Sequence, residues 1–269
     1  MGKYFGTDGF RGEANVDLTV EHAYKVGRFL GWYYGQKNPG ERCRVVIGKD
    51  TRRSSYMFEY SLVSGLTASG ADVFLLHVTT TPSVSYVVRT EGFHCGILIS
   101  ASHNPYYDNG IKVINEKGEK LEEAVITEIE RYLDGKMEEL PLAKRDMIGR
   151  TVDFAAGRNR YIGYLISIAT RSFKNRKVAL DCANGSASAI AKNVFDALGA
   201  QTFVTNNEPN GLNLNTDCGP THIEHLQKFV AEQGCDAGFA SDGDADRCIA
   251  ERIEGKLAHG ARIMYTCGK

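Results

Sequence analysis

The feature that most constrains the fold of this chain is a regular alternation of short apolar runs and helix-length segments, which begins at residue 44. The runs "RVVIG" (44–48), "DVFLLHV" (72–78) and "HCGILIS" (94–100) are rich in branched residues, and amphipathic segments at 54–70 and 81–92 separate them. A strand that helices cover on both faces is apolar along its whole length. The alternation therefore predicts βαβ units in an α/β domain with a mostly parallel sheet.

A second cycle of the same kind follows a charged, aperiodic stretch at 136–150. Its predicted elements are helices at 159–173, 186–200 and 223–234 and strands at 177–182, 201–206 and 235–241. We expect two consecutive α/β domains with mixed, mostly parallel sheets at 1–153 and 154–255, and the start of a truncated third domain at 256–269. The stretches "VVIGKDTRRSS" and "VALDCANGSAS" are alike, and both an internal duplication and the common demands of a parallel sheet explain this.

Composition excludes several classes of function. The chain has 269 residues, 42% of them hydrophobic, and a formal net charge of -1 without dense Lys or Arg runs, which argues against nucleic acid or a membrane as the main partner. No apolar run approaches the length of a membrane span. Seven cysteines without a C-x-x-C pair suit neither a zinc site nor a disulfide framework, so we expect a reducing cytoplasm.

The strongest local signal is "SDGDADR", which directly follows a predicted strand. Asp242, Asp244 and Asp246 alternate, so an extended or looping backbone brings three carboxylates to one hard cation, whereas a helix spreads them apart. Mg²⁺ is the expected ion, and Arg247 beside it favours a phosphoryl group, which a guanidinium binds with two hydrogen bonds. A calcium EF-hand is excluded, because it needs Gly and Glu where this chain has Arg and Ile. The remaining alternative is a solvated acidic turn.

A nucleophile for phosphoryl transfer is offered by "ISASHNPYYDNGIKV", where an apolar run ends in small hydroxyl residues and an Asn-Pro turn. Ser102 would stand in a loop after a strand, followed by His103 and Asn104 as hydrogen-bonding groups, with Lys112 close by as a point charge. Phosphate on Ser102 would complete the shell of a cation held by the three Asp residues. The alternative is that the serines only satisfy backbone groups at a turn.

A third stretch, "FGTDGFRG", places three glycines, Asp8 and Arg11 within eight residues. Glycine-rich backbone lets amides approach a phosphate, which Arg11 could hold, but the same composition also makes an ordinary tight turn. Arg52 and Arg53 in "KDTRRSS" are expected on the surface at the start of a helix, rather than in an anion clamp.

Taken together, these stretches carry a family resemblance. "KYFGTDGFRG", "ISASHNPYYDNGIK", "NGLNLNTDCGPTHIEHL" and "DGDADR" occur in that order, and with them the chain resembles the α-D-phosphohexomutases from Tyr4 to about Ile249. It is most similar to the bacterial phosphoglucosamine mutases, because "FGTDGFRG" stands in place of the Tyr-Asp-Ile-Arg-Gly style of the phosphomannomutase and phosphoglucomutase relatives.

The resemblance implies that Ser102 is a phosphoserine carrier and that Mg²⁺ binds a phosphate oxygen on Ser102 together with the three Asp residues. The side chains implied near the transferring charge are Arg11, His103, Lys112 and Arg247. The implied reaction interconverts glucosamine 6-phosphate and glucosamine 1-phosphate through a sugar bisphosphate, which also serves as activator, on a route to cell-wall precursors. The implied partners are phosphorylated hexosamines or hexoses in the cytoplasm, without nucleic acid or membrane, and a homodimer is compatible with the resemblance.

The chain also departs from the family. Full-length members have four domains, and the Gly-Glu-x-Ser-Gly-His pattern of the third and the Ser-Gly-Thr-rich loop of the fourth are not in this sequence. We therefore expect an N-terminal fragment that is inactive alone, with residues such as Ile263 and Met264 in a disordered, mispacked or oligomer-buried tail. The alternatives are a phosphomannomutase or phosphoglucomutase, a truncated relative that acts as a binding module, and a Mg²⁺-dependent phosphatase.

Overall fold

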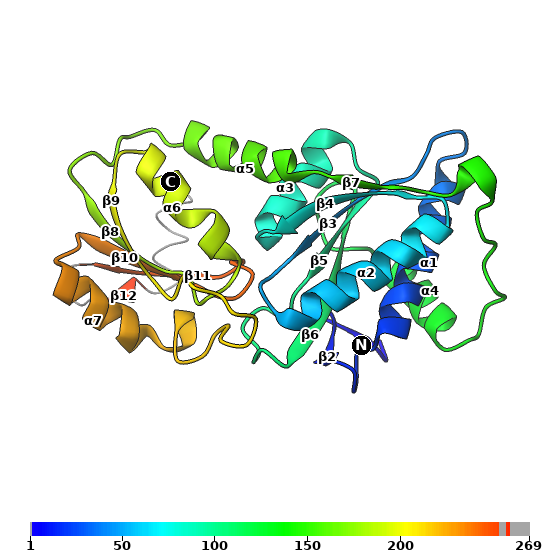
Figure 1. The fold of residues 1–269 in the computed structure, drawn as a ribbon, viewed down its shortest axis with the longest axis horizontal. Helices are drawn as coiled ribbons and strands as arrows, with labels where there is room; N and C mark the ends of the chain where they lie inside the picture. Colours follow the sequence, from blue (N-terminus) through cyan, green and yellow to red (C-terminus); the bar gives the residue numbers. More distant parts are fainter. Residues whose placement is uncertain (1, 253–256, 259–269) are drawn as a thin grey trace.

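The computed structural model describes residues 2–252 and 257–258. They form a first lobe (residues 2–153) and a second lobe (177–252 with 257–258), which lie side by side in Figure 1 and are joined by a helix at 155–167. None of the helices in these residues is long and apolar enough to cross a bilayer. The predicted third-domain start at 256–269 lies outside the described residues except for 257–258, and so does the predicted tail with Ile263 and Met264.

The first lobe contains a seven-stranded sheet with helices on both faces. Its strands are β1 (Phe5–Gly6), β2 (Gly9–Glu13), β3 (Arg44–Lys49), β4 (Asp72–Val78), β5 (Cys95–Ile99), β6 (Asp108–Asn115) and β7 (Thr151–Asp153). Its helices are α1 (Val20–Lys37), α2 (Arg53–Ala68), α3 (Thr81–Glu91), α4 (Glu123–Leu133) and the short η1 (Arg145–Met147). The strand order is β1-β2-β6-β5-β3-β4-β7.

The core of this lobe follows from the period-2 alternation of its strands. In β3, Val45 and Ile47 pack on one face of the sheet against α1, α2 and α4, whereas Val46 packs on the other face against α3. Both faces are therefore buried, which is why β3, β4 and β5 read as continuous apolar runs. These strands and helices α2 and α3 lie within a few residues of their predicted positions.

The mixed character of the sheet is confirmed. Strands β5, β3, β4 and β7 run parallel, while β1, β2, β6 and β5 pair antiparallel. Strand β6 lies between β2 and β5, so the glycine-rich stretch at 5–12 forms the β1–β2 hairpin at this edge of the sheet. The periodicity of the sequence predicts neither β6 nor helix α1, so both are found only in the structure.

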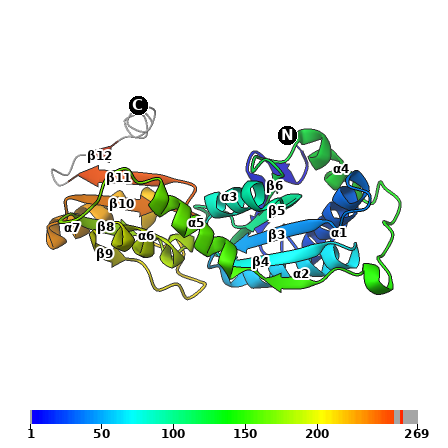
Figure 2. The same cartoon turned by 90° about the horizontal axis from the view of Figure 1, so that it is seen from above.

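The second lobe repeats the architecture on a smaller scale. Its elements are β8 (Lys177–Asp181), η2 (Ser186–Ala189), α6 (Ala191–Ala197), β9 (Gln201–Thr205), η3 (Gly219–Thr221), α7 (Ile223–Gln233), β10 (Ala237–Ser241), β11 (Cys248–Arg252) and β12 (Leu257–Ala258). Strands β10, β8 and β9 are parallel, and β11 and β12 extend the sheet in antiparallel fashion. Helices α6 and α7 cover opposite faces. Helix α5 (Ala155–Ser167) crosses from one lobe to the other, as Figure 2 shows, and packs against α3 and α6.

The lobes meet at the carboxyl ends of β3, β4 and β5, the edge of an α/β sheet where ligands ordinarily bind. Here the Thr51 hydroxyl donates to the Asn184 carbonyl at 2.6 Å, and the Arg53 N–H donates to the Gly211 carbonyl at 3.1 Å. The Thr81 N–H donates to the Asp244 carbonyl at 2.9 Å. Loops from both sheets are therefore in direct contact at one edge, and this edge carries most of the residues singled out from the sequence.

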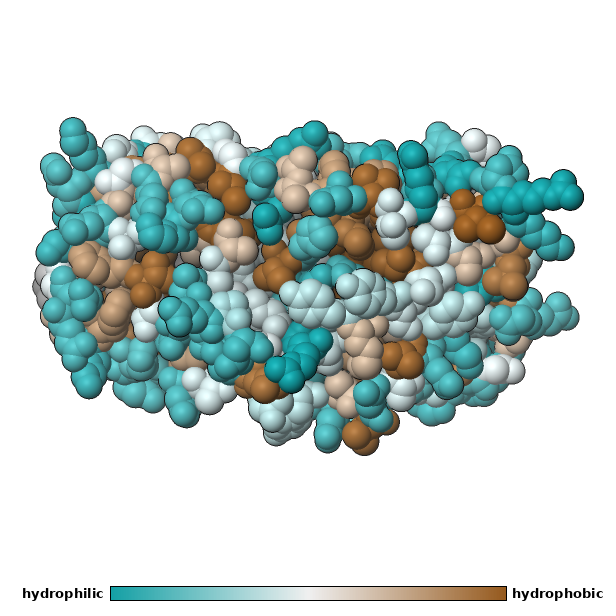
Figure 3. All heavy atoms as spheres, viewed as in Figure 1, coloured by the Kyte–Doolittle hydropathy of each residue, from teal (hydrophilic) through white to brown (hydrophobic). Residues whose placement is uncertain are grey.

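The outer surface in the view of Figure 3 is mostly hydrophilic, with apolar residues in small groups separated by polar ones. The exposed large side chains of α1 and α2 include Tyr24, Tyr56 and Tyr60. Scattered apolar groups of this kind are ordinary on a protein surface.

Candidate active site

Three carboxylates gather in the tight loop between β10 and β11. Asp242, Asp244 and Asp246 each offer an oxygen, and these three oxygens lie within 4.8 Å of one another. The Asp242 N–H and the Arg247 carbonyl close the loop at 3.3 Å, and Ala245 takes a left-handed φ of 54° at its tip. The side chains of Asp242 and Asp244 are fully buried, while Asp246 is exposed. The alternating acidic pattern therefore converges in a loop, as expected from its spacing.

Ser102 comes to this cluster from the other lobe. It follows β5, and the turn it occupies gives it a left-handed φ of 54°, which is rare for a residue with a side chain. Its hydroxyl donates a hydrogen bond to Asp242 Oδ2 and lies 3.4 Å from Asp246 Oδ1. Ser102 itself is 0% exposed. The two motifs, 140 residues apart, are thus in direct contact.

Lys112 projects from β6 into the same cluster. Its ammonium Nζ lies 2.6 Å from Asp244 Oδ2 and 3.0 Å from Asp246 Oδ2. Burial lowers the pKa of Lys112, but the charges and hydrogen bonds of these two carboxylates outweigh it, so the pKa is raised overall. The lysine is therefore a fixed positive charge at neutral pH.

The charges of this cluster are not balanced by Lys112 alone. Burial and the neighbouring carboxylates, Asp244 first, raise the pKa of Asp242 to about 6, against a smaller lowering by the Ser102 hydrogen bond. Asp244 Oδ1 is buried and has no hydrogen-bond partner among the described residues. Hard divalent cations bind carboxylate oxygens, so one cation among the three would balance the charge and satisfy the orphaned oxygen. The residues present fit a metal ion of this type.

Thr81, which the sequence did not single out, holds Asp244 in place. It begins helix α3, and its hydroxyl donates to Asp244 Oδ2 while its N–H donates to the Asp244 carbonyl. Because α3 follows β4, Thr81 lies at the same sheet edge as Ser102. A comparison of the residues that follow each parallel strand could have identified it.

His103 and Arg247 also meet across the lobes. Arg247 Nη1 lies 3.2 Å from His103 Nδ1. Partial burial and then the positive charges of Arg247 and Arg11 lower the pKa of His103. Arg11 lies in β2 opposite Gly110 of β6, and its guanidinium binds Asp8 at 3.2 Å. A neutral imidazole and two guanidinium groups therefore surround the Ser102 loop.

The prediction that Arg52 lies on the surface is wrong. Arg52 is 0% exposed, forms an ion pair with the equally buried Asp50, and donates to the carbonyls of Ser102 and Asn104. Burial of a charge is tolerated when it is paired and hydrogen-bonded, and both conditions hold here. Arg53 is exposed, as predicted.

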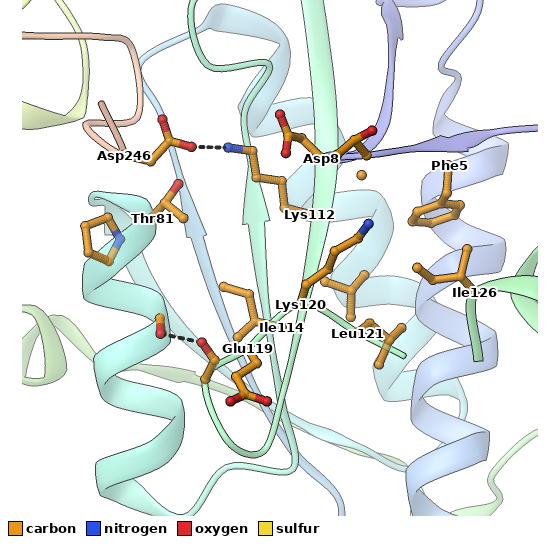
Figure 4. Close-up of a pocket in the computed structure, with 16 residues that line it drawn as sticks. Phe5, Asp8, Thr81, Lys112, Ile114, Glu119, Lys120, Leu121, Ile126 and Asp246 are labelled. Carbon is orange, nitrogen blue, oxygen red and sulfur yellow. Dashed lines mark hydrogen bonds and ion pairs between the residues drawn. The ribbon is translucent and has the colours of Figure 1, made fainter. Parts of the chain in front are cut away.

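A cavity of about 390 Å³ opens beside the acidic cluster, as Figure 4 shows. Lys112, Asp246 and Thr81 lie close together at one end, and the lining also includes the apolar side chains of Ile114 and Leu121. Pockets of this size and composition accommodate small organic molecules. A ligand in the cavity would lie next to the carboxylates that contact Ser102.

Comparison with protein families gives two matches in chain order. Residues 2–139 match alpha/beta/alpha domain I of phosphoglucomutase/phosphomannomutase, and residues 159–252 match domain II. The chain belongs to the phosphoglucomutase/phosphomannomutase family. Within this family its first matched domain contains Ser102 and Lys112, and its second contains the three Asp residues.

Among curated relatives in this family, the chain is 69% identical to a phosphoglucosamine mutase of Lachnoclostridium phytofermentans and 66% identical to one of Lachnospira eligens. It is 48% identical to one of Streptococcus pneumoniae. Each match covers the whole of this chain, which spans 59% to 60% of the length of these relatives.

Solved structures in the family share the fold. A phosphoglucomutase/phosphomannomutase family protein from Burkholderia thailandensis is 24% identical and superposes with a TM-score of 0.78 over 94% of this chain and 55% of its own. Parafusin, a phosphoglucomutase from Paramecium, is 20% identical, with a TM-score of 0.70 over 94% of this chain and 53% of its own. At these identities the likeness concerns the fold alone.

Proposed function

We propose that this chain is the phosphoryl-carrying and metal-binding part of a phosphoglucosamine mutase. The observation that carries the proposal is the contact of the Ser102 hydroxyl with Asp242 and Asp246, because it joins a nucleophile to a cation site across two lobes. Phosphoryl transfer requires this combination, since catalysis consists largely of positioning and charge stabilisation. The chain would work in the cytoplasm, on phosphorylated hexosamines.

Asp242, Asp244 and Asp246 would hold the metal, for which we propose Mg²⁺. The orphaned Asp244 Oδ1 and the raised pKa of Asp242 support a cation at this position. Bound there, Mg²⁺ would supply positive charge to the oxygens of a phosphoryl group on Ser102. Thr81 and Lys112 keep the Asp244 carboxylate in position.

In the proposed reaction Ser102 Oγ carries the phosphoryl group. The P–Oγ bond breaks as a bond forms between phosphorus and a free hydroxyl oxygen of the sugar; that hydroxyl gives up a proton, and the leaving oxygen, Ser102 Oγ, takes one up. The sugar bisphosphate then reverses its orientation, and its other phosphate returns to Ser102. Lys112, Arg11, His103 and Arg247 would bind the oxygens of the group in transfer, and the cavity beside Lys112 leaves space for the sugar.

The choice of glucosamine phosphate rests on the relatives. Three proteins that are 48% to 69% identical to this chain bear the name phosphoglucosamine mutase. A sugar bisphosphate is the proposed activator, because the carrier serine must first be phosphorylated.

The proposal is tested by incubating the 269-residue chain with Mg²⁺ and glucose 1,6-bisphosphate and measuring the intact mass of the protein. We expect one phosphoryl group on Ser102, none in Ser102→Ala, and strongly reduced transfer in Asp242→Asn or with a chelator present. Asp217→Asn, an exposed acidic residue of the same lobe, is the matched control and should behave as the unaltered chain.

Addition of glucosamine 6-phosphate to the phosphorylated chain gives the second readout. Return of the phosphoryl group to the sugar supports the mutase chemistry. Release of inorganic phosphate without a sugar bisphosphate would instead identify a phosphatase. A folded chain whose Ser102 is never phosphorylated would overturn the proposal.

A further inference from the structure

Two donors, one from each lobe, bind the same two carbonyl oxygens of the Ser102 loop. From the first lobe, Arg52 Nη2 donates to the Ser102 carbonyl at 3.3 Å and to the Asn104 carbonyl at 2.6 Å. From the second lobe, Asn215 Nδ2 donates to the same carbonyls at 2.9 Å and 3.1 Å. Asn215 belongs to the stretch "NGLNLNTDCGPTHIEHL", to which the proposed reaction assigns no role.

The loop needs this support because its conformation is strained. Ser102 has a left-handed backbone, which a residue with a side chain adopts only when its surroundings enforce it. Its N–H donates to Ser100 Oγ at 2.9 Å, so only its carbonyl side is left for other partners. The loop is also closely covered, since a Cβ atom on Gly243 would lie 2.5 Å from the Ser102 carbonyl oxygen.

Both donors are themselves held in place. Arg52 is anchored by its ion pair with Asp50, whose Oδ1 accepts from the Arg52 N–H at 3.0 Å and from the Ser55 hydroxyl at 2.7 Å. Asn215 has a left-handed φ of 59°, and its N–H donates to the Ala183 carbonyl at 3.0 Å. Neither side chain contacts the acidic cluster in the described hydrogen bonds, so their influence on it passes through the backbone of the Ser102 loop.

We infer that Arg52 and Asn215 are positioning residues, which together hold Ser102 in the backbone conformation that aims its hydroxyl at Asp242. The inference rests on the proposed function, since it concerns the carrier role of Ser102. It adds that the second lobe contributes to the geometry of the serine as well as to the metal site. Loss of either donor should slow phosphoryl transfer to Ser102 without weakening sugar binding.

Asn215→Gly is the sharpest test, because glycine readily adopts the left-handed backbone and the substitution removes the side chain whose amide donates to the two carbonyls. The matched control is Asp217→Gly, which changes another left-handed residue of the same loop whose exposed side chain makes no hydrogen bond in the described structure. The readout is the rate of Ser102 phosphorylation by glucose 1,6-bisphosphate with Mg²⁺. We expect Asn215→Gly to lower the maximal rate roughly ten- to a hundredfold, because a misplacement of about 1 Å at a reacting group can cost on the order of a hundredfold.

The concentration of bisphosphate that gives half the maximal rate should not change in Asn215→Gly. Arg52→Lys, which keeps the charge beside Asp50 but loses the planar fork, should show the same separation of rate from binding. The double variant should lose more rate than the two single fold-losses multiplied together predict. Each donor compensates in part for loss of the other, so the single variants understate their joint effect.

The outcomes are distinguishable. If the unaltered chain is phosphorylated and Asn215→Gly matches it in rate, this inference fails and the proposed function stands. The inference also fails if Asn215→Gly and Asp217→Gly lower the phosphorylation rate equally, because the loss would then not depend on the Asn215 amide. If the unaltered chain accepts no phosphoryl group at all, the proposed function fails and the positioning role fails with it.

Discussion

At the scale of single residues, Asp242 is held ionised at a cost to stability. Its carboxyl is 0% exposed and stands beside two others, so its pKa in the folded protein is raised to about 6. The folded state therefore binds this proton more tightly than the unfolded state does. Stability of the metal-free chain should consequently rise as the pH falls from about 6 toward the ordinary range of an Asp carboxyl near 4.

Asp242→Asn removes the charge of this carboxylate and keeps an oxygen that accepts from the Ser102 hydroxyl. At pH 7.5 in chelator, the variant should have a free energy of unfolding about 1–3 kcal/mol higher than the unaltered chain. At pH 5 the difference should shrink, because Asp242 is then largely protonated. Urea unfolding at the two pH values measures both numbers, and a difference that grew at pH 5 would contradict the explanation.

Local sequence patterns predict some residues of the candidate site but not others. Asp242, Asp244, Asp246 and Ser102 could be predicted because alternating carboxylates and a serine at a strand end are local patterns. Arg52 was assigned to the surface because arginine is seldom fully buried. Its burial depends on Asp50 and on two loop carbonyls 50 and 52 residues away, and no local pattern records such partners.

At the scale of elements, the loop between β10 and β11 and the Ser102 loop approach so closely that only glycine fits at residue 243. A Cβ atom there would lie 2.5 Å from the Ser102 carbonyl oxygen and 3.0 Å from a Leu214 methyl group. Gly243→Ala should therefore lower the free energy of unfolding by about 1–3 kcal/mol and separate Ser102 from Asp242.

Gly163→Ala in α5 is the matched control, because nothing lies within 4 Å of its added methyl group. It should raise stability by about 0.5–1 kcal/mol, the ordinary gain of alanine over glycine inside a helix. Chemical denaturation compares the two variants. Equal effects would show that the contact at Gly243 is not restrictive.

The edge of the first sheet depends on a single carboxylate of α4. Glu130 accepts hydrogen bonds from the N–H groups of Lys3, Tyr4 and Phe5 at 2.8 to 3.0 Å. Burial raises the pKa of Glu130, but the three donors outweigh it and lower the pKa overall. Its contribution to stability is thus present above the ordinary pKa of glutamate and is lost as the pH falls through the lowered value.

Glu130→Ala should lower the free energy of unfolding by about 1–3 kcal/mol at pH 7, because three N–H donors lose their acceptor and those of Tyr4 and Phe5 are partly buried. Hydrogen exchange of residues 3–6 should accelerate in the same variant. Glu128→Ala, two residues earlier in the same helix and with its carboxylate on Arg131, is the control and should leave that exchange unchanged. Unaltered exchange in Glu130→Ala would show that the β1–β2 hairpin is held by other contacts.

Elements were predictable where one periodicity continued for a whole strand or helix. Strand β6 was missed because its first residues, Asp108 to Gly110, are a common turn sequence. In the structure Gly110 is required inside the strand, since a Cβ atom there would lie 2.5 Å from the Ser100 carbonyl oxygen. The approach of the serine loop, a tertiary contact, decides the local conformation in this case.

At the scale of the whole molecule, the lobes share the candidate metal site, and a cation should therefore stabilise both. Trp32 in α1 is the single tryptophan, so its fluorescence reports unfolding of the first lobe alone. At a Mg²⁺ concentration one hundred times the dissociation constant, the gain in unfolding free energy should be about 2.7 kcal/mol. We expect Trp32 fluorescence and circular dichroism to record the same shift in urea.

Asp242→Asn should abolish this shift, because one of the three carboxylates is lost. A Mg²⁺ effect seen by circular dichroism but not by Trp32 fluorescence would mean that the lobes unfold independently.

The number and order of the lobes could be predicted from the two cycles of strands and helices. Their docking could not, because it depends on single contacts such as Thr51 with Asn184.

The 140 residues between Ser102 and Asp242 also set an order of events during synthesis. At ordinary elongation rates the ribosome makes the serine about 7 to 28 s before the aspartate that receives its hydrogen bond. The first lobe can fold in that interval, but its serine loop then lacks Asn215 and the acidic cluster. The nascent chain therefore contains Ser102 well before it contains the Asp242 carboxylate that accepts its hydrogen bond, so this contact between the lobes forms only late in synthesis.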